Sequence, residues 1–332
     1  MTFTLRPAVR EKIGLLFGVS GASGSGKTYT ALLLAKGIAN GTGRIAVIDT
    51  EAGRALHYAP RKTVVADHTK GTFDFLHLDF PPPFTPSRYI EAIRAAEEAG
   101  ATVIVVDSMS HEWAGEGGCS DMQLAEAERM AKASGKTMDA MTAPAWKRPK
   151  LEHQRMMARL IQTRSHLIFC LRAQEKVKIV GGKVTPVGFQ PISEKSFPFE
   201  LSGSFMLHPD RPGCPDWGLP KKLNSDLQSI FPDGHLIGPE AGKRLRMLAE
   251  TGEDRPSADK AAEGVRDLIE RIQDAPDADT LHAIVADPRV IKQRDWLRAN
   301  RADLADRVDA AVNDALAIFD MPSASDEMEE AA

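Results

Sequence analysis

The segment GASGSGKT, from Gly21 to Thr28, constrains this chain more than any other feature. It follows an apolar run at residues 13–20 and opens a helical pattern at residues 28–39, which is the context that a phosphate-binding loop requires. Its glycines let backbone N–H groups turn inward on phosphates, and the helix N-terminus adds its positive end. The segment therefore predicts a nucleotide site on an α/β core.

Individual side chains of this loop have predicted contacts. Lys27 is expected to reach the β- and γ-phosphate oxygens, and the hydroxyl of Thr28 is expected to bind Mg²⁺. The sequence has no N-K-x-D guanine-recognition motif, so ATP is favoured over GTP. The residues predicted to bind ATP are Gly21, Ala22, Ser23, Gly24, Ser25, Gly26, Lys27, Thr28 and Tyr29.

Two carboxylates that follow predicted strands complete the predicted site. Asp107 ends the apolar run ATVIVVD, where it can complete the coordination of Mg²⁺ with Thr28. Glu51 follows the strand predicted at residues 44–49, and a carboxylate at that edge can orient the attacking water. A turn-capping Asp or a solvated loop Glu is the alternative. We predict Glu51 and Lys27 as catalytic residues.

Short apolar runs alternate with helical patterns over the first 210 residues, which favours an α/β fold with a mainly parallel central sheet. Strands are predicted at residues 13–20, 44–49, 73–78, 102–107, 166–172 and 204–207, and helices at residues 28–39, 87–99 and 150–164. Residues 176–180 and 183–187 are predicted to form a hairpin around Gly181 and Gly182.

A boundary is predicted near residues 251–257, where TGEDRPS lacks apolar residues. Helices are predicted beyond it at residues 258–273, 278–286, 291–298 and 301–319. The acidic end lacks aromatic and branched residues and is predicted to be disordered. The predicted organisation is an ATPase domain at residues 1–251, a linker at 252–258, a helical module at 259–320 and a tail at 321–332.

The net charge of −4 is unevenly distributed. Residues 253–332 contain 10 Lys and Arg against 20 Asp and Glu, whereas the preceding residues carry a net charge of +6. The densest basic stretch lies between Ala143 and Lys183. It predicts contact with single-stranded DNA, in which lysines and arginines bind phosphates and Trp146 stacks on a base. The candidates are Trp146, Lys147, Arg148, Lys150, Arg155 and Arg159. The alternative is a solvated helix face.

The P-loop, the strand ending in Asp49-x-Glu51 and the strand ending in Asp107-Ser108 resemble the core of RecA-like recombination ATPases. The chain is more similar still to phage-encoded nucleotide-binding proteins of that superfamily, the Sak-type single-strand annealing ATPases. This likeness covers about the first two thirds of the chain. It rests on DTEAGR at 49–54, VVDSMSHEW at 105–113, the basic segment at 145–177 and PISEKSFPFELSGSFML at 191–207.

The resemblance implies a RecA-like P-loop core and DNA-stimulated ATP hydrolysis with Mg²⁺, in which Glu51 is the catalytic carboxylate. It also implies a homo-oligomeric ring or filament on single-stranded DNA during phage recombination, annealing or replication. A single-strand-binding protein is a possible further partner, and the expected place is the cytoplasm of a bacterial host, with no membrane contact.

In RecA-like proteins, the strand after the basic helix ends in a residue that senses the γ-phosphate. Here that edge carries Arg172 and Gln174, where Gln or His is more usual, and either residue can be the sensor. We include Arg172 among the catalytic candidates. Subunits of the superfamily often complete one another's sites with a basic residue, for which Lys176, Lys178, Lys221 and Lys222 are candidates.

Three other functions fit the P-loop. A helicase loader or a DNA-packaging motor would use hydrolysis to remodel a protein or move duplex DNA. A small-molecule phosphotransferase would need an acceptor pocket and an arginine-rich lid, and the sequence has no second-substrate motif. A binding module with an inactive site is disfavoured because Lys27, Thr28, Glu51 and Asp107 are all present.

Overall fold

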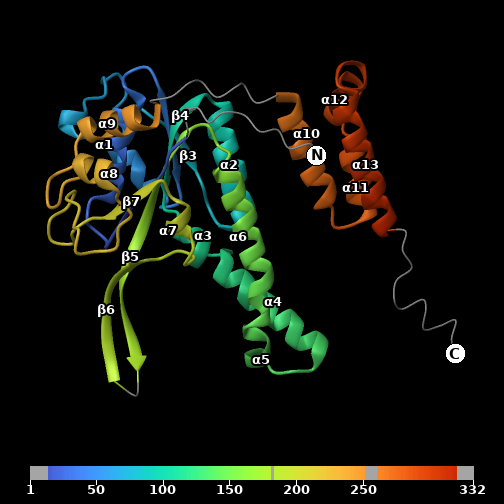
Figure 1. Ribbon diagram of the computed structural model, residues 1–332, viewed down its shortest axis with the longest axis horizontal. Helices are drawn as coiled ribbons and strands as arrows, with labels where there is room; N and C mark the ends of the chain where they lie inside the picture. Colours follow the sequence, from blue (N-terminus) through green and yellow to red (C-terminus); the bar gives the residue numbers. More distant parts are fainter. Residues whose placement is uncertain (1–13, 181–182, 251–259, 320–332) are drawn as a thin grey trace. The chain divides into compact units, whose positions relative to one another are not determined.

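The computed structural model describes residues 14–180, 183–250 and 260–319 (Figure 1). The chain divides into two compact units, Met1–Glu253 and Asp254–Ala332. The predicted linker at 252–258, the predicted tail at 321–332 and the predicted turn at Gly181 and Gly182 lie outside the described residues. The domain boundaries therefore stay predictions.

Within the described residues, the first unit contains a seven-stranded sheet in the order β3-β2-β4-β5-β1-β7, with β6 paired to β5. All neighbours along this path are parallel, and β6 is antiparallel to β5. The strands are β1 (Leu16–Gly21), β2 (Arg44–Asp49), β3 (Leu76–Asp79), β4 (Ala101–Asp107), β5 (His166–Val180), β6 (Lys183–Pro191) and β7 (Gly203–Met206). This confirms the predicted α/β fold with a mainly parallel sheet.

Helices cover both faces of the sheet, which explains why the central strands are almost wholly apolar (Figure 1). One face carries α1 (Lys27–Ala39), α8 (Ser225–Ile230) and α9 (Pro239–Glu250), and the other carries α2 (Pro86–Glu98) and α6 (Lys147–Leu160). The other helices of the first unit are α3 (Ser110–Ala114), α4 (Cys119–Ser134), α5 (Met138–Thr142), α7 (Phe197–Glu200) and the short 3-10 helices η1 (Arg54–Tyr58), η2 (His68–Lys70) and η3 (Pro144–Trp146).

The parallel register brings the carboxyl ends of the central strands to one edge. Gly21 at the end of β1 is level with Arg172 on β5. Asp107 at the end of β4 is level with Asp49 on β2 and with Cys170 on β5. The P-loop and the predicted carboxylates therefore meet at the same edge of the sheet.

The structure differs from the predicted elements of the first unit in several places. Strand β3 begins at Leu76 rather than at residue 73, because Phe73 is buried in a loop against Tyr29. The runs predicted at 166–172 and 176–180 form the single strand β5, since no turn residue separates them. Helices α3, α4, α5, α7, α8 and α9 were not predicted from the sequence.

The second unit is helical, as predicted. Its described residues, 260–319, form α10 (Lys260–Gln273), α11 (Ala278–Ala286), α12 (Pro288–Asn300) and α13 (Ala302–Phe319). Its core contains Val265, Leu268, Leu281, Leu297 and Val308, all buried. Helix α12 is longer than the predicted 291–298 because Asp287 caps it and Pro288 fixes its first turn.

Candidate active site

The P-loop leaves β1 and enters α1 in a conformation that depends on its glycines. Gly24 and Gly26 have φ angles of 81° and 85°, a left-handed region in which other residues are strained. A Cβ on Gly21 would lie 2.4 Å from Oγ of Ser25, whose hydroxyl donates to the carbonyl of Ala22 at 2.9 Å. Because of this tight turn, the N-terminus of α1 points toward the predicted phosphate site.

The N-terminus of α1 has the character of an anion site. Its cap residue is Gly26, no side chain caps it, and its first turn has no acidic residue. The first N–H groups of a helix have no partner within the helix, so a phosphate is a suitable acceptor. Nζ of Lys27 donates to the carbonyl of Ala22 at 2.9 Å, which keeps the ammonium beside the loop.

The other predicted loop residues differ in their surroundings. Ser23 is exposed. The ring of Tyr29 packs against Tyr58 and Phe73 at centroid distances of 5.8 and 5.7 Å. A contact of Tyr29 with a nucleotide would therefore use its backbone N–H in the first turn of α1 rather than its ring.

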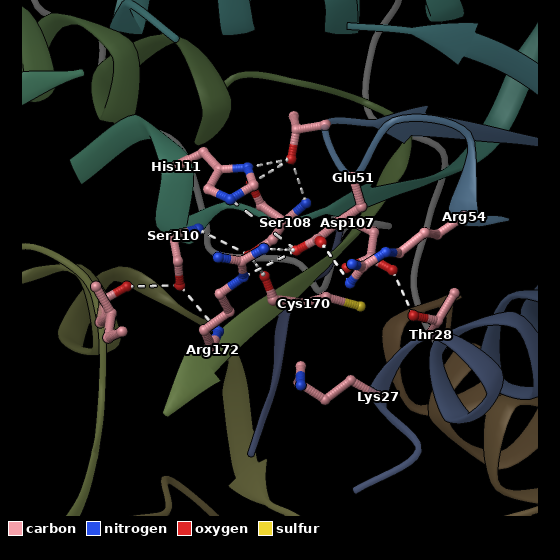
Figure 2. A network of polar contacts seen from close by, with 12 residues as sticks. Lys27, Thr28, Glu51, Arg54, Asp107, Ser108, Ser110, His111, Cys170 and Arg172 are labelled. Carbon is pink, nitrogen blue, oxygen red and sulfur yellow. Dashed lines mark hydrogen bonds and ion pairs between the residues drawn. The ribbon is translucent and has the colours of Figure 1, made fainter. Parts of the chain in front are cut away.

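Thr28 and Asp107 meet directly at the loop. Oγ1 of Thr28 donates to Oδ2 of Asp107 at 2.5 Å (Figure 2). Burial raises the pKa of Asp107, and Glu51 and Asp49 raise it further, whereas Thr28 and Lys27 oppose the rise. A buried carboxylate and a hydroxyl beside the predicted phosphates are the oxygen ligands that Mg²⁺ prefers, so these residues fit that ion.

Glu51 is held by two arginines. Its Oε1 accepts hydrogen bonds from Nε and Nη2 of Arg172 at 2.9 and 2.6 Å, and its Oε2 accepts one from Nη1 of Arg54 at 3.2 Å (Figure 2). The Glu51 side chain is 12% exposed, against 45% for Arg172 and 74% for Arg54. The structure thus brings Arg172 to the predicted carboxylate, across a separation of 121 residues.

Asp49 shapes the loop that carries Glu51. Its fully buried carboxylate accepts the N–H groups of Glu51 at 2.7 Å and Ala55 at 2.9 Å, and it lies 3.2 Å from Nε2 of His77. All of these contacts are within the loop and the neighbouring strand. In the motif Asp49-x-Glu51, the carboxylate of Asp49 therefore stabilises the loop, and the carboxylate of Glu51 faces the predicted ATP site.

A polar network that sequence reasoning missed lies behind Glu51. Oγ1 of Thr50 accepts the N–H of Ser108 at 2.7 Å and lies 2.7 Å from Nδ1 of His111. Nε2 of His111 lies 4.0 Å from Oε1 of Glu51. Burial and Arg172 lower the pKa of His111, and Glu51 opposes them. The motif SMSHEW contained this residue, but the sequence offered no spacing rule that links it to Glu51.

The γ-phosphate sensor candidates are separated by the structure. The backbone N–H of Arg172 donates to Oγ of Ser110 at 2.9 Å, and its guanidinium lies at Glu51. Gln174 is exposed further along β5, with Gln190 as its register partner in the hairpin. This geometry favours Arg172.

The four lysines considered as contributors to a neighbouring subunit also differ. Nζ of Lys222 donates to the carbonyls of Phe199 and Leu201 at 2.7 and 2.5 Å, and Nζ of Lys221 donates to the carbonyl of Trp217. Lys176 and Lys178 are exposed on the β5–β6 hairpin, which extends away from the rest of the first unit (Figure 1). The two hairpin lysines are therefore better placed to reach another molecule.

The predicted DNA-binding face lies on α6 and η3. Trp146 stacks on Trp113 at a centroid distance of 5.1 Å and an interplanar angle of 12°, so one face of its ring is already covered. Arg148 pairs with Glu152 at 3.4 Å. Within the described part of the chain, Lys147 and Lys150 are exposed and have no carboxylate partner. Arg155 is exposed and Arg159 is half-buried on the same helix.

A buried pair anchors α6 to α3. Nδ1 of His153 lies 3.0 Å from Oε1 of Glu112, and Sγ of Cys119 donates to the same oxygen at 3.1 Å. Glu112 and His153 are each 2% exposed, and burial raises the pKa of Cys119. These contacts tie α6 to the helix that follows β4.

The parallel sheet, the P-loop and the strand-end carboxylates define a P-loop ATPase domain. The chain matches the family model described as an AAA domain over residues 14–203, and it belongs to that family. Among solved structures it is similar to one titled "Crystal structure of the RadB recombinase", with 17% identity over 74% of this chain and 93% of that chain and a TM-score of 0.34. No curated protein matches the chain.

The predicted P-loop core with a mainly parallel central sheet is confirmed by the family and the strand order. The phage origin and the Sak-type relationship stay predictions. None of the described helices is both long and apolar enough to cross a membrane.

Proposed function

We propose that this chain binds and hydrolyses ATP at the P-loop and acts on single-stranded DNA in phage recombination or annealing. The observation that carries the catalytic part is the contact of Thr28 with Asp107 beside the P-loop, with Glu51 at the adjacent strand end. Thr28 and Asp107 would hold Mg²⁺, which when bound neutralises charge on the β- and γ-phosphate oxygens.

Lys27, Glu51 and Arg172 would each have a separate role in ATP hydrolysis. The ammonium of Lys27 would exchange the carbonyl of Ala22 for phosphate oxygens, because charged acceptors form stronger hydrogen bonds with it. Glu51 would accept a hydrogen bond from the attacking water and orient it. Arg172 would stabilise charge on the γ-phosphate, as an arginine does in related phosphoryl transfers.

Single-stranded DNA would lie along the basic face of α6. Lys147 and Lys150 are exposed there, and Trp146 beside them is half-buried, with Trp113 stacked on one face of its ring. Lysines track phosphates, and an aromatic ring is a stacking surface for an unpaired base. Lys176 and Lys178 would extend this contact or reach the ATP site of a neighbouring copy in a ring or filament.

The test is ATP hydrolysis by the purified chain with and without a single-stranded oligonucleotide, at two salt concentrations. Lys27→Ala is the control for the ATP site. Lys147→Ala/Lys150→Ala tests the DNA face, and Lys243→Ala is a matched loss of a surface lysine on α9. We expect stimulation that weakens with salt, disappears in Lys27→Ala and has a salt slope reduced by about two in the double variant.

Other outcomes would select other functions. Turnover that requires Lys27 but is indifferent to DNA would favour a phosphotransferase or a protein-remodelling ATPase such as a helicase loader. Stimulation by duplex rather than single-stranded DNA would favour a packaging motor. Equal salt slopes for the double variant and Lys243→Ala would remove α6 from the DNA face while leaving the ATP site in place.

A further inference from the structure

The carboxylate of Glu51 is nearly saturated with donors in the structure. A carboxylate offers about four acceptor positions. Two are taken on Oε1 by Arg172 and one on Oε2 by Arg54. A water molecule that must be oriented for attack therefore has little room at this carboxylate until Arg172 moves to a γ-phosphate.

The departure of Arg172 would leave Oε1 of Glu51 without a donor. A donor group close to that oxygen is His111, whose Nε2 lies 4.0 Å away. Its side chain is 14% exposed, so water has limited access to it. A carboxylate that orients a water needs a fixed geometry, because small misplacements cost large factors in rate.

The ring of His111 is fixed from two sides. It stacks on Phe84 at a centroid distance of 4.9 Å and an interplanar angle of 26°. Its Nδ1 lies 2.7 Å from Oγ1 of Thr50, which already accepts the N–H of Ser108. The single hydroxyl hydrogen of Thr50 has a nearer acceptor in this Nδ1 than in the carbonyl of Ser108, which is 3.2 Å away. The second ring nitrogen then carries the hydrogen that faces Glu51.

We propose that His111 is a positioning residue for Glu51: its Nε2–H takes the place of Arg172 on Oε1 and holds the carboxylate toward the attacking water. The inference rests on the proposed function, in which Glu51 orients that water. It assigns a role in hydrolysis to the residue four positions after Asp107, through the contact chain Ser108–Thr50–His111–Glu51. No covalent bond to His111 is formed or broken in this role.

Three substitutions at His111 separate its two nitrogens. The amide of His111→Gln reaches the position of Nε2 and can donate to Glu51. The shorter amide of His111→Asn reaches the position of Nδ1 and keeps the contact with Thr50 only. We expect His111→Asn and His111→Ala to lower kcat about tenfold to a hundredfold without weakening ATP binding, and His111→Gln to restore most of the loss.

A pH profile gives a readout that a structural role would not move. Glu51 and Arg172 are the charged groups that face His111. Protonation of the ring would break the acceptor contact with Thr50 that fixes the ring, and it would turn the Nε2–H contact into an ion pair that makes Glu51 a weaker acceptor for the water. The wild-type kcat should therefore fall in acid with a limb that His111→Gln lacks.

Controls keep this inference distinct from the proposed function. Hydrolysis that requires Lys27 and is lost in Glu51→Gln supports the ATP site, whatever happens at His111. In that case a His111→Asn variant that folds, binds ATP and turns over at the wild-type rate overturns the positioning role alone. Turnover that is unaffected by Glu51→Gln, or its absence from the wild-type chain, overturns both.

Discussion

Replacing Arg172 by Ala is expected to slow ATP turnover while hardly changing the stability of the fold. The guanidinium donates twice to Glu51, but 45% of the Arg172 side chain is exposed. An ion pair with such exposure contributes at most about 1 kcal/mol after screening by solvent. For a domain of this size the expected loss in melting temperature is no more than about 4 °C.

The substitution has two opposing effects on turnover. Removing the ion pair frees one oxygen of Glu51 for the attacking water. If the whole ion-pair energy of about 1 kcal/mol opposed turnover, its loss would raise kcat roughly fivefold. Removing a cation that stabilises charge at the γ-phosphate costs about a hundredfold or more. The second effect is larger, so kcat should fall by at least about twentyfold.

The assay is steady-state ATP hydrolysis, with urea unfolding of the same preparations. Arg54→Ala is the matched control, because Arg54 makes one 3.2 Å contact with Glu51 and is 74% exposed. It should change kcat by less than about fivefold. A folded Arg172→Ala variant with turnover within fivefold of the wild type would refute the assignment of Arg172 to the γ-phosphate.

Three further outcomes are expected. Asp107→Asn keeps an acceptor for Thr28 but removes charge, so hydrolysis should need about tenfold to a hundredfold more Mg²⁺, as a titration of the ion would measure. Gly37→Ala should destabilise the first unit by about 1–3 kcal/mol in urea unfolding, because its Cβ would lie 1.9 Å from a backbone oxygen of α9. Gly264→Ala is the control and should not lower the free energy of unfolding of the second unit, because its Cβ would meet only the end of a glutamine side chain. Burial lowers the pKa of His166, whose Nδ1 accepts the N–H of Leu15. The unfolded chain therefore binds the proton more readily, and stability should fall as pH drops below about 6.5. His166→Asn, which retains an acceptor, should flatten this dependence in thermal unfolding measured from pH 8 to 5.

The part of the site that the sequence predicted follows from strand geometry. Apolar runs predict parallel strands, and residues at their carboxyl ends meet at one edge whatever the intervening helices are. Thr28, Glu51 and Asp107 were placed at that edge for this reason, and the structure brings Thr28 and Asp107 into contact. The glycine spacing likewise predicted the loop, because few other backbones have those φ angles.

Most of the missed features depend on contacts that no local pattern encodes. The pairing of Arg172 with Glu51 is a choice among several polar residues at the same edge, and packing decides it. Helix α3 has five residues, too few to produce a helical period. Helix α9, in contrast, could have been predicted from the sequence, because its apolar residues repeat at helical spacing and Pro239 marks its start.

Four consecutive residues of α3 connect parts of the first unit that the proposed function must couple. Ser110 bonds the backbone of Arg172 on β5 and that of Ile192 after β6, at the base of the hairpin. His111 reaches the loop of Glu51, Glu112 binds α6 through its buried histidine, and Trp113 stacks on the aromatic residue that begins the basic face. A short helix that contacts neighbours on all these sides, with Ser110 and Glu112 buried, is expected to move as one body, because packed residues cannot shift independently. A shift of the hairpin would reach Glu51 directly through Arg172 on β5, whereas a shift of α6 would reach it through α3 and His111.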